Sequence, residues 1–549
     1  MKKIPVCTIL TETSPQALPL GAACIVSAIN QHFKENPLSQ EEVSSSLTFF
    51  SAEDNLSAQK IASVLLKDNP PAICFSVFVW NHKIFSETAK IIRNANPDIF
   101  LIAGGPEVTA LASDFDEFDY LITGEGESVV PKLLQDILTN SESLQKPLAK
   151  PVILHGTRVP PEKLPSPYLD GTLNPRHFDG GALWELARGC PFKCSYCYES
   201  KGEKTVCYFP MERIKQELQY FNKTGVQQVF VLDPTYNAQK KRALEILSLI
   251  KKDAPDIFFH FECRAEFLDS ELVKVFSKIP CSLQIGLQSA DEKVLSLVNR
   301  NFNRKDFSKK IALLNNFGVI FGFDLIFGLP SDTLQGFMDS IDFAINLYPN
   351  SLELFRLSVL PGTTLYDNHK ELGLTAQAEP PYLVQASDTF SPKDLDKAEE
   401  IAFATSLFYS AGRAVPWFHS VIKPLKCKPS VFFMNFSQFL KRTGKNNSKQ
   451  CLSHLEIEKL QCDFITEQYK QHKLDRLLFA ALDLIKLNGA YSRSYADSLT
   501  TKLNLSYHPD DLFSPYTEDL FFFCKNAQKG RFCIKMKPSG NGPVWENIR

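Results

Sequence analysis

Two runs of alternating strand and helix patterns constrain the fold of this chain more than any other feature. In the first run, the third and fourth strand segments are almost entirely apolar, which is expected for strands covered by helices on both faces. Residues 1–140 are therefore expected to form a doubly wound, Rossmann-like α/β domain. Its expected strands are Ile4–Leu10, Leu47–Ser51, Ala72–Phe78, Phe100–Ala103 and Tyr120–Thr123, and its expected helices are Leu20–Phe33, Ala58–Lys67, Ile84–Asn94 and Val129–Leu138.

The second run begins at Gly181 and contains six strand segments with helical segments between them. This order predicts a parallel barrel or a partial (β/α)6 barrel over residues 181–378. The expected strands are Leu183–Ala187, Gln228–Leu232, Ile257–Glu262, Ser282–Leu287, Val319–Ile326 and Leu352–Leu357. Residues 141–180 hold seven prolines, so we expect a linker there without helix or strand. Residues 379–549 are expected to form a mostly helical C-terminal domain.

The composition fits a globular protein without a dominant charged ligand. Lys and Arg number 60, and Asp and Glu number 62. Because a protein that grips a phosphate backbone carries a clear basic excess, nucleic acid is not expected as a partner. No apolar run reaches the roughly 18 residues of a membrane span, and the short apolar start is interpreted as a strand rather than a signal peptide. The expected location is the cytoplasm, where free thiols persist.

Three cysteines directly after the first predicted barrel strand form the sharpest motif. Cys190, Cys194 and Cys197 are spaced as CxxxCxxC. Three thiolates on one loop can hold three irons of a cubane cluster and leave the fourth iron open to a small molecule. The alternative is a structural zinc site with Cys207 as a fourth thiolate. The position after a barrel strand and the lack of paired CxxC knuckles both favour the cluster.

With Tyr196 at the aromatic position, this motif resembles the CxxxCxΦC signature of the radical-SAM superfamily. The resemblance implies a 4Fe–4S cluster whose open iron chelates S-adenosylmethionine, which a low-potential electron then cleaves to a 5′-deoxyadenosyl radical. Three later segments resemble family motifs in the same order. They are Gln284–Ser289 (QIGLQS), Phe323–Pro330 (FDLIFGLP) and Leu360–Thr363 (LPGT).

The resemblance also implies which residues contact S-adenosylmethionine. Tyr196 is expected near the adenine, and Gln288, Ser289 and Asp324 supply further contacts. The second barrel strand departs from the usual Gly-Gly-Glu ending, so Asp233 or Asn237 is expected to replace the contact to the methionine amino group. Arg264 is expected to bind the methionine carboxylate or the ribose, and a surface ion pair is its alternative.

Three loops in the first domain follow the carboxyl ends of predicted strands, where open α/β sheets bind ligands. They are Ser76–Asn81 (SVFVWN), Gly104–Thr109 (GGPEVT) and Gly124–Glu127 (GEGE), and they resemble the cobalamin-binding domain found upstream of many radical-SAM domains. The resemblance implies that cobalamin is cradled by Ser76, Trp80, Asn81, Gly104, Gly105, Pro106, Gly124, Glu125 and Gly126.

The loop Thr11–Gly21, expected around the nucleotide tail, contains no histidine. The resemblance therefore implies base-off cobalamin without a lower His ligand. A vestigial Rossmann domain that has lost the ligand is the alternative.

The two resemblances together imply a cobalamin-dependent radical-SAM enzyme, and the commonest activity of that group implies transfer of a methyl group to an unactivated carbon. The substrate is expected to be a small molecule or a peptide, and the electron donor a flavodoxin or ferredoxin. The alternatives are a rearrangement chemistry and a non-catalytic protein that binds the cluster or corrinoid. Residues 421–450 carry basic residues interleaved with phenylalanines, and we expect a solvated face over an aromatic core there rather than an RNA-binding surface.

Overall fold

The computed structural model describes residues 2–12, 14–38, 42–140, 150–200, 205–446, 452–540 and 542–548. The chain divides into two compact units, and each is interleaved along the sequence. The first unit comprises Met1–Leu283, Val298–Arg300 and Ser358–Val384, and the second comprises Gln284–Leu297, Asn301–Leu357 and Gln385–Arg549.

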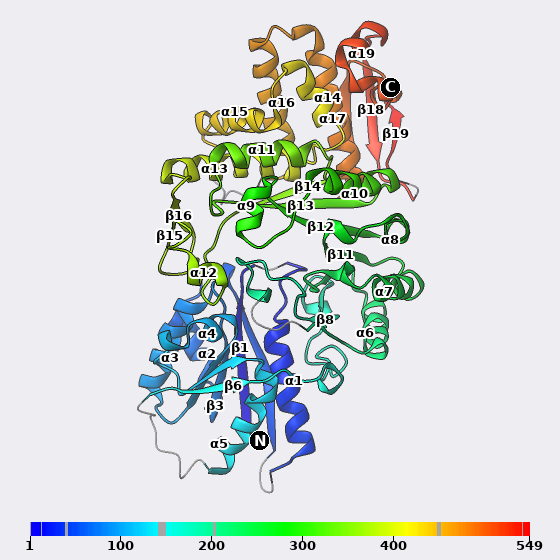
Figure 1. Ribbon diagram of the computed structural model, residues 1–549. Helices are drawn as coiled ribbons and strands as arrows, with labels where there is room; N and C mark the ends of the chain where they lie inside the picture. Colours follow the sequence, from blue (N-terminus) through cyan, green and yellow to red (C-terminus); the bar gives the residue numbers. More distant parts are fainter. Residues whose placement is uncertain are drawn as a thin grey trace. The chain divides into compact units, whose positions relative to one another are not determined.

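The first unit opens with a six-stranded parallel sheet in the order β2-β1-β3-β4-β5-β6. The strands are β1 (Lys2–Leu10), β2 (Val43–Ser51), β3 (Ala72–Ser76), β4 (Phe100–Gly104), β5 (Tyr120–Gly124) and β6 (Val152–Gly156). Helices α1 (Leu20–Glu35) and α5 (Val130–Asn140) share one hydrophobic core with the sheet, and α2 (Ala58–Leu65) and α3 (His82–Ala95) share another (Figure 1). Two cores, one on each face, confirm the predicted doubly wound domain.

Strand β6 corrects the prediction that residues 141–180 contain no sheet. It pairs in parallel with β5, from Tyr120 opposite Val152 to Gly124 opposite Gly156. Proline is tolerated at the border of an edge strand, and Pro151 directly precedes β6 without interrupting it. The prolines of this segment therefore flank a short strand and do not exclude one. Residues 141–149 of the predicted linker lie outside the described residues.

The first three predicted barrel strands also belong to the first unit. They are β7 (Gly181–Trp184), β10 (Gln228–Val231) and β11 (Phe258–Cys263), which pair in parallel in that order. They alternate with α6 (Met211–Thr224), α7 (Lys240–Asp253) and α8 (Ser270–Phe276). A short antiparallel pair, β8 (Ala187–Arg188) and β9 (Cys207–Tyr208), brackets the cysteine motif.

The second unit contains the other half of the strand series. Strand β12 (Cys281–Gln288) begins in the first unit and ends in the second, and β13 (Ile320–Phe327) pairs in parallel with β14 (Ser351–Arg356). Their helices are α9 (Glu292–Leu297), α10 (Arg304–Phe317) and α11 (Leu334–Ile345). All six strands and their alternating helices are present, as the sequence predicted.

The C-terminal part of the second unit is mostly helical, as predicted, and packs around aromatic side chains. Its main helices are α13 (Pro392–Thr405), α14 (Phe418–Ile422), α15 (Pro429–Arg442), α16 (His454–Gln471), α17 (Asp475–Ala496) and α19 (Leu520–Asn526). The chain then forms an antiparallel sheet that the sequence analysis missed, made of β17 (Thr501–Leu505), β18 (Phe532–Lys537) and β19 (Val544–Asn547). Strand β18 alternates buried Ile534 and Met536 with more exposed neighbours, a period-2 pattern that a search for helices overlooks.

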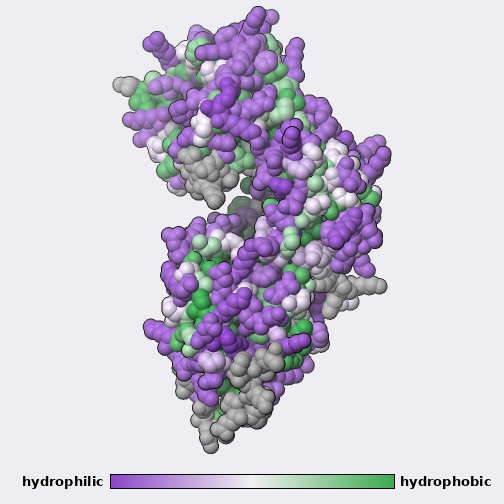
Figure 2. Space-filling model, turned by 90° about the vertical axis from the view of Figure 1, so that its left-hand side faces the viewer, coloured by the Kyte–Doolittle hydropathy of each residue, from purple (hydrophilic) through white to green (hydrophobic). Residues whose placement is uncertain are grey.

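Within the basic stretch 421–450, the described residues 421–446 have the predicted arrangement of an aromatic core below exposed basic side chains. Phe432, Phe433, Phe436 and Phe439 are buried. Lys428 and Arg442 pair with acidic residues of other helices at 3.2 and 2.7 Å. The face of the molecule drawn in Figure 2 is largely hydrophilic. No described helix is both long and apolar enough to cross a membrane.

Candidate functional site

The cysteine loop begins at Gly189, which has a φ of +92°. Three backbone or amide contacts from distant parts of the chain hold this loop. The Ser195 N–H donates to Val298 O at 3.0 Å, Leu365 N–H donates to Ser195 O at 2.8 Å, and Asn299 Nδ2 donates to Lys193 O at 2.7 Å. The loop conformation is therefore fixed by segments more than one hundred residues away.

The three thiols on this loop fit an iron–sulfur cluster by their chemistry. None is in a disulfide, and Cys194 is buried while Cys190 and Cys197 are partly buried. Burial raises the pKa of Cys197 to about 11, so this thiol ionises at neutral pH only beside a strong positive charge such as a metal. Arg300 Nη1 lies 4.0 Å from Cys194 Sγ and adds positive charge there. Sequence analysis missed Arg300, which lies in the segment that contacts the loop.

The zinc alternative is weakened by the fourth cysteine. Cys207 Sγ accepts a hydrogen bond from Arg158 Nη1 at 3.5 Å. Among the described residues, no three or more His, Cys, Asp or Glu side chains are placed so that together they could hold a metal ion. Cys207 is therefore engaged by Arg158 and is not placed with the other three thiols, and the preference for a cubane rests on the set of three cysteines.

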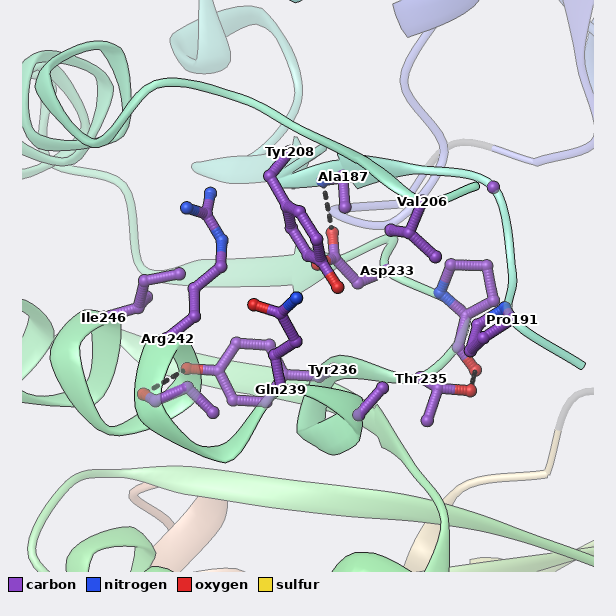
Figure 3. Close-up of a pocket in the computed structure, with 14 residues that line it drawn as sticks. Ala187, Pro191, Val206, Tyr208, Asp233, Thr235, Tyr236, Gln239, Arg242 and Ile246 are labelled. Carbon is purple, nitrogen blue, oxygen red and sulfur yellow. Dashed lines mark hydrogen bonds between the residues drawn. The ribbon is translucent and has the colours of Figure 1, made fainter. Parts of the chain in front are cut away.

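Asp233 is placed behind the cysteine loop, where it holds the backbone that leads into it. Its Oδ1 accepts N–H groups of Leu186 and Ala187 at 2.9 and 3.0 Å. Burial raises the pKa of Asp233 to about 7, although those two donors oppose the rise. Asp233 also lines a cavity of about 20 Å³ beside Pro191, drawn in Figure 3, which has room for a single water. Its predicted contact with S-adenosylmethionine stays a prediction.

Asn237 and Arg264 form a second support for the loop. The Asn237 side-chain amide donates to Arg264 O at 2.9 Å and accepts from Arg264 N at 3.0 Å. The Arg264 guanidinium lies 3.6 Å from the ring centre of Phe192, which belongs to the cysteine loop, and it pairs with Glu266 at 2.7 Å. The ion pair of the alternative interpretation is therefore present, but Arg264 is only 7% exposed and contacts the loop.

The remaining predicted contacts to S-adenosylmethionine fall on both units. Tyr196 lies on the loop in the first unit, and burial raises its pKa. In the second unit, Gln288 ends β12 with a φ of +67°, and its Oε1 is buried without a partner. Asp324 accepts from Gln284 Nε2 at 2.6 Å, and Ser289 is 2% exposed. The unpaired Gln288 oxygen marks a place where a ligand or water would complete the hydrogen bonding.

The loop Ser76–Asn81 is held from within. Asn81 is fully buried, donates to Ser76 O at 3.2 Å and accepts from Phe78 N at 2.8 Å. Trp80 is 50% exposed, stacks on Phe78 with ring centres 4.5 Å apart, and donates from Nε1 to Ile9 O at 2.8 Å. Asn81 therefore shapes the loop, and Trp80 presents a large apolar face.

Two glycines bring the next loops close to neighbouring strands. A Cβ on Gly105, whose φ is +114°, would lie 2.5 Å from Val77 O, and a Cβ on Gly124, whose φ is +80°, would lie 2.5 Å from Gly156 O. Both positions require glycine. Gly104 ends β4, and Gly126 packs against Ile25.

Pro106 opens helix α4 (Pro106–Ala110), and its carbonyl accepts from the Tyr198 hydroxyl at 3.1 Å. Since Tyr198 follows Cys197, this bond joins the loop Gly104–Thr109 to the cysteine loop. Glu125 makes no contact with the cavity described below and instead pairs with Arg158 and Arg188, each at 3.2 Å.

A cavity of about 510 Å³ lies at the carboxyl ends of β1 and β3. Of the predicted residues, Thr11, Glu12, Gln16–Gly21 and Trp80 line this cavity, and residues of the barrel half line it too. Sequence analysis missed those residues, which are Leu183, Glu185, Arg188 and Leu232, and also Glu127 of the GEGE loop. Of these residues, only Arg188 could have been found from the sequence, because it lies two residues before Cys190. None of the described lining residues is a histidine.

Comparison with known proteins agrees with this arrangement. A model of the radical SAM superfamily matches residues 184–344, and a model of the B12 binding domain matches residues 19–134. The cobalamin-dependent radical SAM methyltransferase TokK of Streptomyces tokunonensis is 27% identical over 54% of this chain and 48% of TokK. A 2-(S-pantetheinyl)-carbapenam-3-carboxylate methyltransferase of Streptantibioticus cattleyicolor is 25% identical over 57% of this chain and 50% of that protein. The chain thus spans about half the length of these curated relatives.

A solved structure shares the fold. The cobalamin-dependent S-adenosylmethionine radical enzyme OxsB matches with a TM-score of 0.55 over 86% of this chain and 80% of OxsB, at 13% sequence identity. At that identity the likeness concerns the fold alone. The two matched models cover the cysteine loop and most of the N-terminal sheet, which are the regions that carry the predicted motifs. The chain therefore carries a radical SAM domain, matched over residues 184–344, and a B12 binding domain ahead of it, matched over residues 19–134.

Proposed function

We propose that this chain is a cobalamin-dependent radical SAM enzyme that transfers a methyl group to an unactivated carbon. The carrying observation is the 510 Å³ cavity, because the B12 binding domain forms one wall and the strand ends that lead into the cysteine loop form the other. Ligand sites of parallel sheets lie at the carboxyl ends of their strands, so one cavity serves both domains. The two curated relatives described above are methyltransferases by name, which supports the same reaction class.

Each group of residues has a proposed role. When bound, the 4Fe–4S cluster, S-adenosylmethionine and cobalamin supply a carbon-centred radical and a methyl group. Cys190, Cys194 and Cys197 are proposed as ligands to three irons, which leaves one iron for S-adenosylmethionine. Arg300 places a cation beside the Cys194 sulfur.

The proposed contacts to S-adenosylmethionine follow the sequence motifs and the local geometry. Tyr196, Gln288, Ser289 and Asp324 are proposed to touch it directly. Asp233, Asn237 and Arg264 bond to the backbone or contact the loop, so we assign them a positioning role in addition to any direct contact.

Cobalamin is proposed to bind base-off, because the Thr11–Gly21 loop offers no histidine. A flavodoxin or ferredoxin of the cytoplasm is the proposed reductant, and the substrate is a small molecule or a peptide.

Anaerobic reconstitution tests the proposal in two steps. The chain should take up about four irons and, with dithionite and S-adenosylmethionine, should release 5′-deoxyadenosine. With hydroxocobalamin and cell extract added, an extract component should gain a methyl group from labelled S-adenosylmethionine. Failure to form 5′-deoxyadenosine would eliminate the radical mechanism. Cleavage without cobalamin binding would favour a vestigial cobalamin domain.

A further inference from the structure

Arg188 connects the GEGE loop, Gly124–Glu127, to the cysteine loop. It lies two residues before Cys190 and directs its guanidinium toward three carboxylates. Glu125 and Glu127 belong to the GEGE loop after β5, at 3.2 and 2.9 Å, and Glu185 belongs to the turn between β7 and β8, at 3.0 Å. One cation therefore links two loops that are about sixty residues apart in sequence.

This cluster is largely shielded from water and forms part of the cavity wall. The side chain of Arg188 is 15% exposed and that of Glu127 is 8% exposed, and both line the cavity together with Glu185. Burial raises the pKa of Glu185, and Arg188 opposes that rise. Because water screens this cluster weakly, loss of the cation would leave three carboxylates facing one another, and two of them, Glu127 and Glu185, line the cavity.

A second arginine links the same loop to the other side of the cysteine motif. Arg158 Nε lies 3.2 Å from Glu125 Oε1, and its Nη1 donates to Thr205 O at 2.8 Å. Thr205 precedes β9, the strand that pairs with β8 across the motif. At its start the GEGE loop is fixed by Gly124, where a Cβ would strike Gly156 O. Movement of one loop therefore displaces the other.

We infer that Arg188 is a positioning residue that makes the binding of the iron–sulfur cluster and the binding of cobalamin cooperative. Cluster ligation fixes Cys190, and with it Arg188, which then fixes the two carboxylates of the GEGE loop, of which Glu127 lies on the cavity wall. Cobalamin binds a wall that is already ordered. Coupling between two binding sites is reciprocal, so cobalamin tightens the cluster by the same factor. The inference rests on the proposed function.

The experiment compares the affinity for hydroxocobalamin of the full chain with and without the reconstituted cluster, from changes in the corrin absorption. Wild type should bind at least about fivefold more tightly when the cluster is present, the lower end of typical coupling. Arg188→Met should bring this ratio close to one. Glu127→Gln, a milder change on the opposite loop, should reduce it. Circular dichroism verifies that each variant is folded.

Arg93→Met is the matched control. Arg93 pairs with Asp119 at 2.7 Å in the same domain, and its side chain is 20% exposed, but the pair lies at the start of β5 rather than at its end. This variant should keep the wild-type ratio. A wild-type ratio of one, or an unchanged ratio in Arg188→Met, would overturn the inference. If wild type binds no hydroxocobalamin in either state, the cobalamin part of the proposed function fails, and the inference fails with it.

Discussion

The cysteine loop and the helical region around Phe408 are held by different kinds of interaction. The loop is held by hydrogen bonds from residues 298–299 and 365. The helical region depends on ring packing, since Phe408 is fully buried with Phe432 and Phe436 at centroid distances of 5.0 and 4.9 Å. Polar contacts fix the position of individual atoms, whereas ring packing mainly fills volume. This difference explains why the loop carries a readable motif and the helical region does not.

The strongest test of this comparison removes a sulfur from the loop. Cys194→Ala should abolish the formation of 5′-deoxyadenosine and lower the iron content, because a cluster held by two protein thiolates is poorly retained. Iron analysis and chromatography of the product measure both effects. Cys207→Ala is the matched variant and should keep about four irons per chain. Equal iron loss in the two variants would indicate that Cys207 also ligates the metal, as in the four-cysteine alternative.

A substitution in the helical region should change stability without changing the cluster. Phe408→Ala removes a fully buried ring and should lower the free energy of unfolding by about 3–5 kcal/mol. Denaturant unfolding followed by circular dichroism measures the loss. Iron content after reconstitution should stay at the wild-type value. A large drop in iron at temperatures where the variant is folded would contradict the separation between the two regions.

Backbone strain in a cobalamin loop should give an intermediate effect. Gly105→Ala places a methyl group 2.5 Å from Val77 O at a φ of +114°, a strain of about 1–3 kcal/mol. Affinity for hydroxocobalamin should fall about tenfold, as expected for about 1.4 kcal/mol. In Gly104→Ala, the added methyl meets only Ile122, at 3.4 Å. An equal loss in both variants would point to direct contact with the corrin instead of strain.

The smallest expected effect concerns pH. The pKa of Asp233 is raised to about 7 in the fold, while an unfolded aspartate has a pKa of about 3.9. The folded chain therefore binds this proton more tightly, and the associated stability, complete below pH 4, is lost as the pH rises through about 7. The free energy of unfolding of the cluster-free chain, measured in urea, should therefore fall less between about pH 4 and pH 7 in Asp233→Asn than in wild type. The exposed Asp256→Asn is the control, and parallel curves for wild type and Asp233→Asn would refute the assignment.

Much of the fold could be predicted because strands and helices leave periodic patterns. The predicted strands of the N-terminal sheet and of the barrel series lie within a few residues of their expected positions. The loops at their carboxyl ends could therefore be located from the strand ends. Strand β6 was hidden by the surrounding prolines, and β17 to β19 by the helical context. Their stability comes from pairing with distant segments, which a local pattern does not record.

The candidate site was predictable only where residue type and spacing define the chemistry. The cysteine spacing identified the loop, and glycines at strand ends identified Gly105 and Gly124. The engagement of Asp233 and Asn237 by backbone groups was not predictable, because it depends on where side chains meet in space. The same holds for Arg188, whose partner Glu127 lies 61 positions away.

The interleaving of the two units sets an order of events during synthesis. Leu365 donates to Ser195 from 170 positions further along the chain, since 365 minus 195 is 170. A ribosome that has just released the cysteine motif has therefore not yet made the segments that shape it. Iron delivered at that moment would meet an incompletely braced loop. A fully braced loop is therefore available for metal insertion only after the chain up to Leu365 has left the exit tunnel.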